Sequence, residues 1–92
     1  MKKIDFRKIT IKDVEGNDIP ADISKQLGNQ MYMQGQNIEE CELGRDIYHN
    51  GEVELDEQQA KTVERFVGSY SYIMRTPILE MLGVTPKNVN NL

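Results

Sequence analysis

The chain has few of the residues from which catalytic and metal sites are usually built. Its 92 residues include one cysteine, one histidine and no tryptophan. One cysteine excludes a disulfide within the chain, and a zinc site usually takes about four ligands, mostly cysteine and histidine. The phosphate-binding patterns GxxxxGK(S/T) and GxGxxG and the hydrolase pattern GxSxG are also absent. We therefore predict that the protein is not an enzyme and holds neither a metal nor a cofactor.

Long apolar segments are missing as well. No apolar run follows the basic start MKKIDFRK, so we expect no signal peptide. No stretch approaches the roughly 20 apolar residues of a membrane-spanning helix. These features predict a soluble, cytoplasmic protein with a reduced thiol and no membrane partner.

Aromatic residues are scarce too, with four tyrosines and two phenylalanines. Hydrophobic residues make up 38% of the chain and charged residues 28%, which is typical of a small folded domain with a modest core. Such a chain buries limited apolar area. A second copy or another protein would therefore help to cover its faces.

Charge is unevenly distributed around a net value of −4. Residues 1–13 hold five basic and two acidic side chains, whereas residues 39–57 hold eight acidic side chains and one arginine. The acidic balance argues against a general nucleic-acid binder. Three interpretations stay open: head-to-tail association, a partner with a basic patch, and an ordinary solvated surface.

Alternating apolar residues predict a β-hairpin over residues 6–23. Ile9 and Ile11 share one face of the first strand, and EGND supplies the turn. Pro20 lacks an N–H donor, so the returning strand should lie at an edge.

Helices are predicted over about 24–34, 38–49, 57–75 and 77–82. Asn50-Gly51 stops the second, Asp56 and Gln59 form a capping box for the third, and Thr76-Pro77 begins the last. The segment EVEL, 52–55, is either a short third strand or an extended connection. The predicted fold is α+β: the hairpin packs on three to four helices in one domain, 1–83, followed by a flexible tail, 84–92.

Three glycines, Gly28, Gly44 and Gly68, fall inside predicted helices, where each costs roughly 1 kcal/mol relative to alanine. They indicate either close helix crossings or helix boundaries that are set wrongly.

The stretch IYHNGEVELDEQQA resembles a metal or acid–base site in composition only. Cys41 and His49 are eight residues apart on one predicted helix, about 12 Å along its axis, too far to bind one ion together. The acids of EVELDE alternate with apolar residues and have no glycine for a calcium-loop turn. We interpret His49 as a helix-end residue. A hydrolase that uses His49 with the nearby acids is a further hypothesis for function, ranked below the two that are stated at the end of this section.

A partner-binding surface is the sharper interpretation of the methionines and tyrosines. QMYMQ places three large side chains in a row, so they cannot all face one core, and SYSYIM turns its two tyrosines to different sides. Incidental exposure is the other interpretation. With two acids of EVEL added, the predicted surface comprises Met31, Tyr32, Met33, Tyr72, Glu52 and Glu54.

The segment DISKQLGNQMYMQGQNIEECELGRDIYHNGEVELDEQQAKTVERFV, about residues 22–67, resembles small proteins associated with bacteriophages and prophages of gut Bacteroides-type bacteria. The resemblance lies in the LGN helix, in DIYHNGEVEL and in DEQQA at a helix start. It implies a small accessory protein from a phage gene cluster in a bacterial cytoplasm, and it brings no catalytic residues. We expect a protein–protein interaction or assembly module that binds another protein or itself. The alternative is a nucleic-acid-linked regulator or an acidic DNA mimic.

Overall fold

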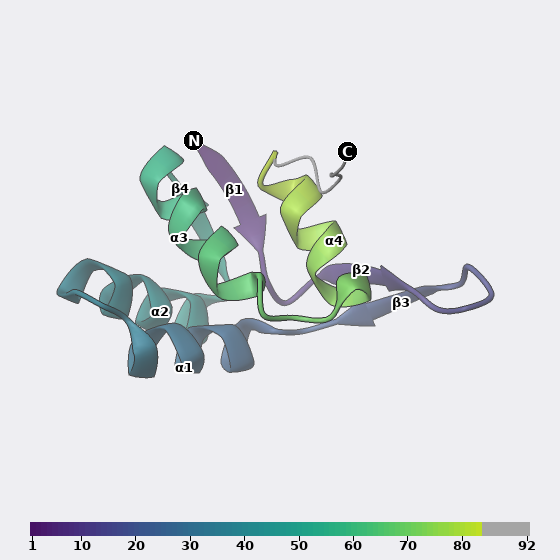
Figure 1. The fold of residues 1–92 in the computed structure, drawn as a ribbon, viewed down its shortest axis with the longest axis horizontal. Coiled ribbons are helices and arrows are strands. Elements are labelled where there is room, and N and C mark those ends of the chain that lie inside the picture. The colour runs from purple at the N-terminus through teal and green to yellow at the C-terminus, as the bar shows by residue number, and fades with distance from the viewer. Residues whose placement is uncertain (84–92) are drawn as a thin grey trace.

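The computed structural model describes residues 1–83, and the predicted tail, 84–92, lies outside the described residues. The elements follow in the order β1 (Lys2–Asp5), β2 (Ile9–Lys12), β3 (Asp18–Ala21), α1 (Ser24–Gln34), α2 (Ile38–Asn50), β4 (Glu52–Leu55), α3 (Glu57–Val67) and α4 (Tyr72–Met81). Figure 1 shows α1 and α2 lying together at one end, with α3 and α4 standing beside the strands. The α+β class predicted from the sequence is confirmed.

The predicted hairpin is present as β2 and β3. They pair antiparallel, with Ile9 opposite Ala21 and Ile11 opposite Ile19, and Gly16 adopts a positive φ of 87° in the turn. Ile9 is fully buried, whereas Ile19 is half exposed. The turn end of the hairpin extends away from the helices (Figure 1).

The segment EVEL forms a strand, β4, but its partner is β1 rather than the hairpin. The sequence gives no period-two signal for β1, because Ile4 is the one apolar residue of KKID. Phe6 follows β1 and lies outside the hairpin, which begins at Ile9 and not at residue 6. Its N–H donates to the Gly51 carbonyl (2.8 Å) and its carbonyl accepts from Ile23 N–H (2.9 Å), so its buried ring stands where the chain segments meet.

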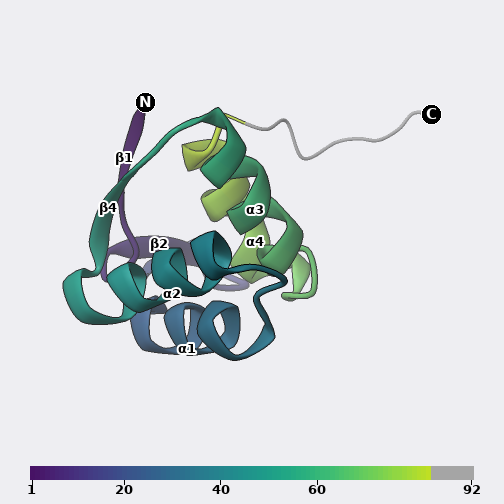
Figure 2. The same ribbon diagram turned by 90° about the vertical axis from the view of Figure 1, so that its left-hand side faces the viewer.

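Helices α1 and α2 run antiparallel, one beside the other (Figure 2). They cross very closely at two glycines. A Cβ atom on Gly28 would lie 2.6 Å from the backbone nitrogen of Tyr48. A Cβ atom on Gly44 would lie 2.7 Å from both the Gly28 carbonyl oxygen and the backbone nitrogen of Tyr32. For these two glycines, the close-crossing interpretation is confirmed.

The predicted boundary between the last two helices is wrong. Helix α3 ends at Val67, before Gly68, and α4 begins at Tyr72, where the Ser71 side chain accepts from Met74 N–H. Pro77 lies inside α4 rather than at its first position. The apolar periodicity misleads here because it runs on past Gly68 through Ile73, which the structure leaves half exposed.

The core is built from strand, helix and linker residues that bury nearly all of their side-chain surface. It comprises Ile4, Phe6, Ile9, Ile23, Leu27, Met31, Leu43, Ile47, Leu55, Val63, Phe66, Val67, Tyr70, Ile78, Leu79 and Leu82. The predicted capping box of α3 is confirmed: Asp56 Oδ1 accepts from Gln59 N–H (2.8 Å), and Gln59 Oε1 accepts from Asp56 N–H (3.0 Å).

A charged hydrogen-bond network joins the start of α2 to α3. The Glu40 carboxylate accepts from the two terminal guanidinium nitrogens of Arg65, Nη2 (2.6 Å) and Nη1 (3.0 Å), and from Gln36 N–H (2.9 Å). The Glu40 side chain is only 10% exposed, and the Arg65 side chain is 45% exposed. The Arg65 hydrogen bonds, with that from Gln36, hold the pKa of Glu40 below its ordinary value.

Replacing Glu40 with glutamine should lower the free energy of unfolding by about 1–2 kcal/mol at pH 7, because the charge-assisted hydrogen bonds are lost. A carboxyl group with a lowered folded-state pKa stabilises the fold above its ordinary pKa, here 4.5. The difference between wild type and Glu40→Gln should therefore hold from about pH 5 to 8 and shrink as the pH falls through the lowered pKa. Urea denaturation across this pH range measures it. Glu42→Gln is the control, since Glu42 lies 3.9 Å from Arg45 in an exposed pair, and an equal loss in both variants would contradict the prediction.

Candidate functional site

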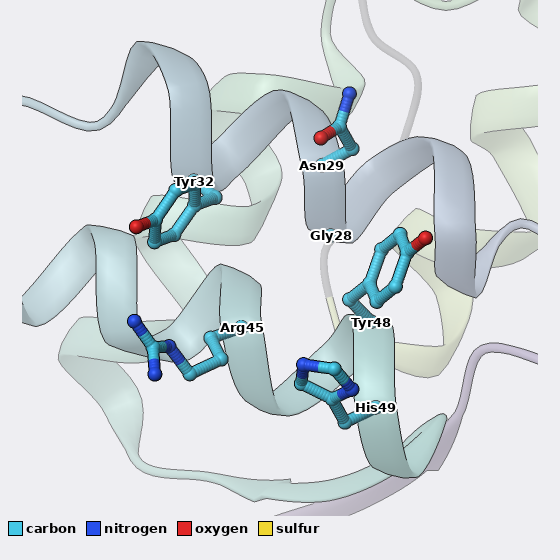
Figure 3. A pocket seen from close by; sticks show the side chains of 6 residues that line it. All are labelled: Gly28, Asn29, Tyr32, Arg45, Tyr48 and His49. Carbon is cyan, nitrogen blue, oxygen red and sulfur yellow. The ribbon is translucent and has the colours of Figure 1, made fainter.

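The outer face of α1 and α2 carries two adjoining hollows. The first, of about 270 Å³, is lined by Gly28, Asn29, Tyr32, Arg45, Tyr48 and His49 (Figure 3). The second is lined by Lys25, Gln26, Asn29, Gln30, Met33, Gln34 and Tyr48. Because Asn29 and Tyr48 line both, the hollows form one continuous surface, which we call the α1–α2 groove.

The helix crossing explains why two tyrosines stand in this groove. Each helix contains the pattern Gly-x-x-x-Tyr, as Gly28 with Tyr32 and as Gly44 with Tyr48. In the antiparallel pair, each glycine packs against the backbone at the other helix's tyrosine. No space remains between the helices there for a large ring, so both rings project outward. Figure 3 shows them on either side of Gly28.

The apolar spacing of the segment that forms α2 predicts that Leu43, Ile47 and Tyr48 all face inward, and the structure corrects this for Tyr48. The structure buries Leu43 and Ile47 but leaves Tyr48 37% exposed. A helical stripe assigns Tyr48 to the inward face, and only the approach of Gly28 to its backbone moves the ring out of the helix interface.

Basic groups lie against both rings. The Arg45 guanidinium carbon is 5.6 Å from the centroid of the Tyr32 ring, and Lys25 Nζ is 4.3 Å from that of Tyr48. Lys25 Nζ also donates to the Tyr48 carbonyl oxygen (2.9 Å), and the His49 ring meets the Tyr48 ring edge-on at 5.2 Å. Such cation–π contacts favour these ring positions by about 0.5–1 kcal/mol each at an exposed site. None of the described residues that line the groove is acidic, although the chain has 15 Asp and Glu residues.

The structure does not bring the six predicted surface residues together. Tyr32 (44% exposed) and Met33 (71%) line the groove, but Met31 is fully buried beneath it. Assigning Met31 to the surface is wrong because it continues the buried stripe of Leu27. The other three are exposed but lie on different elements, Tyr72 on α4 and Glu52 and Glu54 on β4.

Lys25, Asn29 and Arg45 were not singled out by the sequence. They are ordinary polar residues of helix surfaces, and their role depends on which ring the partner helix places beside them. The repeated Gly-x-x-x-Tyr spacing is the one local signal that could have pointed to the groove.

The acidic stretch that resembles a chemical site is spread over several elements. Among residues 1–83, no group of three or more His, Cys, Asp or Glu side chains is placed to hold a metal ion. Cys41 packs against Gly35, at the opposite end of α2 from His49. Within the same residues, every helix is too short or too polar to cross a membrane.

Charges that are separated along the sequence meet in space. Lys3 of β1 lies opposite Glu54 of β4, although they belong to the basic and the acidic segment respectively. Asp5 accepts from the Arg7 guanidinium at 2.9 and 3.0 Å, which lowers the pKa of Asp5 to about 2. Part of the basic N-terminal segment, Lys3 and Arg7, therefore lies beside acids.

No protein-family model, no curated protein and no solved structure matches the chain.

Proposed function

We propose that this protein is a non-enzymatic protein–protein interaction module whose α1–α2 groove is its docking surface. The observation that carries the proposal is the cluster of Tyr32, Tyr48, Met33 and Arg45 in one groove without acidic lining. Tyrosine, methionine and arginine are enriched at the centres of protein interfaces, whereas aspartate and glutamate are depleted there.

The rigidity of the groove also supports docking. Its base is the crossing at Gly28 and Gly44, where backbone meets backbone with no side chain between them. The tyrosine rings are already held by Arg45 and Lys25. A surface that is ordered before binding loses less conformational entropy when a partner arrives, so more of the contact energy appears as affinity.

The resemblance to phage-associated proteins suggests where to look for the partner. We propose that the protein serves as an accessory factor in phage assembly or host interaction, and that a product of a neighbouring gene occupies the groove. A second copy of this chain is the competing occupant.

The test uses products of the neighbouring genes, screened by bacterial two-hybrid and then measured as purified proteins by calorimetry. The Tyr32→Ala/Tyr48→Ala double variant should weaken binding at least tenfold, because central aromatic anchors dominate interface energies. Tyr72→Ala is the matched control: Tyr72 is 61% exposed and lies 5.8 Å from the Arg75 guanidinium carbon, but it is outside the groove. Binding that is lost with Tyr72→Ala and kept in the double variant would overturn the proposal. So would a strict monomer by light scattering for which no partner is recovered.

A further inference from the structure

We infer that the α1–α2 groove binds an acidic peptide segment of its partner, with an Asp or Glu carboxylate at Arg45 and His49 and the peptide backbone along the amide side chains of α1. This inference rests on the proposed function and specifies the chemistry of the occupant.

Charge complementarity sets the sign of the ligand. Lys25, Arg45 and His49 stand around the groove, and none of the described lining residues is acidic. The Arg45 guanidinium has five N–H donors, and the ion pair that it makes within residues 1–83, with Glu42, is long (3.9 Å) and about half exposed. A partner carboxylate that makes two parallel hydrogen bonds to Arg45 would therefore outcompete Glu42.

The other half of the groove favours a peptide over a nucleic acid. Four side-chain amides line it, those of Gln26, Asn29, Gln30 and Gln34. Each amide offers both donors and an acceptor, which matches the alternating N–H and C=O groups of a peptide backbone. A phosphate backbone offers acceptors only, and proteins that hold it use an extended row of cations. Among the described residues that line the second hollow, Lys25 is the one cation, and it already donates to the Tyr48 carbonyl oxygen.

The aromatic and thioether groups that line the groove predict that the ligand also has an apolar part. Tyr32 and Tyr48 flank the first hollow, and Met33 lines the second as a flexible apolar side chain that is 71% exposed. A peptide in which an acidic residue stands next to a large apolar or aromatic residue would match both the basic groups and the apolar groups of the groove.

The acidic segment of a second copy fits this description poorly. Residues 52–57, EVELDE, combine acids with Val53 and Leu55. However, Leu55 is fully buried and Val53 is partly buried against the core, so neither can enter the groove of another molecule while its own fold is intact. Residues 52–57 of a second copy are therefore a poor occupant, and the occupant that we infer is a segment of a different protein.

The experiment selects ligands from a phage-displayed library of random 12-residue peptides on the immobilised protein. Selected peptides should be enriched in Asp or Glu beside Tyr, Phe or Leu. One is synthesised with a fluorescent label, and its binding is measured by fluorescence polarisation and mapped by amide chemical shifts in NMR. Shifts should concentrate in residues 25–34 and 45–49.

Two substitutions test the contact that the inference names. Arg45→Gln should weaken binding at least tenfold, and so should replacing the peptide carboxylate by its amide. The two changes together should cost about as much as either alone, because they remove one interaction. Lys61→Gln on α3 removes the same charge from an exposed position outside the groove and should leave the affinity unchanged.

The outcomes separate this inference from the proposed function. Uncharged or basic peptides that bind the groove, or acidic peptides indifferent to Arg45→Gln, would overturn the inference and leave the docking groove standing. If the oligonucleotide dT12 binds the same residues more tightly than the peptides do, and in a salt-sensitive way, the ligand of the groove is a nucleic acid and the inference is overturned. Groove shifts that appear with rising concentration of the protein alone would identify a second copy as the occupant. Shifts confined to other faces would overturn both proposals.

Discussion

Replacing Gly44 with alanine is expected to lower the free energy of unfolding by about 1–3 kcal/mol, the range for forcing an extra methyl group into a packed interior. The added Cβ atom would lie 2.7 Å from the Gly28 carbonyl oxygen and from the Tyr32 backbone nitrogen, and 2.8 Å from Met31 Cβ. Two of these three atoms belong to the backbone, so a side-chain rotation cannot relieve the contact. The helices must separate, and this cost exceeds the gain of about 1 kcal/mol in helix propensity.

Gly68→Ala is the control for Gly44→Ala. Urea denaturation of the two variants measures the difference in their free energies of unfolding. At Gly68 the nearest atoms to an added Cβ are the carbonyl oxygens of Arg65 (3.3 Å) and Glu64 (3.5 Å), and φ is −59°. The backbone there accepts alanine with a small local adjustment, so the free energy of unfolding should change by less than about 1 kcal/mol. Similar losses at Gly44 and Gly68 would mean that the crossing is looser than its geometry indicates.

The same substitution connects the fold to the proposed docking surface. Because the Gly44 side of the crossing contacts the Tyr32 backbone, separating the helices also moves the Tyr32 ring away from Arg45. Molecules of Gly44→Ala that remain folded should therefore bind a partner more weakly.

Much of the fold follows from local patterns in the sequence. Several elements have a signal within a few residues of sequence. The hairpin has alternating apolar residues, α1 and α2 have apolar residues at a spacing of four, and α3 has the capping pair Asp56 and Gln59. β1 has no such signal, because a four-residue strand with Ile4 as its one apolar residue is identified only by the β4 strand beside it. The break at Gly68 is hidden for the opposite reason, since the apolar stripe continues through it and only tertiary packing turns Ile73 outward.

The candidate site was less predictable than the fold, for a physical reason. Sequence alone shows that Met31, Tyr32 and Met33 cannot all be buried, and the four-residue spacing from Leu27 favours burial of Met31, but it does not show which surface Tyr32 and Met33 line. The repeated Gly-x-x-x-Tyr pattern is visible, yet its meaning depends on the antiparallel register that sets Gly28 on Tyr48. Arg45 becomes part of a groove only because that register brings Tyr32 beside it.

The second large prediction concerns the two methionines of α1, of which Met31 is buried and Met33 is exposed. Met31→Ala should lower the free energy of unfolding by about 2–5 kcal/mol, because it empties a fully buried position in the core. Met33→Ala removes the same atoms from a position that is 71% exposed, so stability should change by less than about 0.5 kcal/mol. The two residues lie two positions apart on one helix, so differences in helix propensity cancel between the variants. Urea denaturation of both proteins measures the contrast.

Partner binding should show the opposite order. At a temperature where Met31→Ala remains folded, its affinity should stay near that of the wild type, because the groove keeps its lining. Met33→Ala should bind more weakly, because Met33 lines the groove beside the amides of Gln30 and Gln34. If Met33→Ala binds normally and folded Met31→Ala does not, the recognition surface depends on the core beneath α1 and not on the groove. That result would move the docking surface away from α1–α2, while the stability difference between the variants would still follow from burial alone.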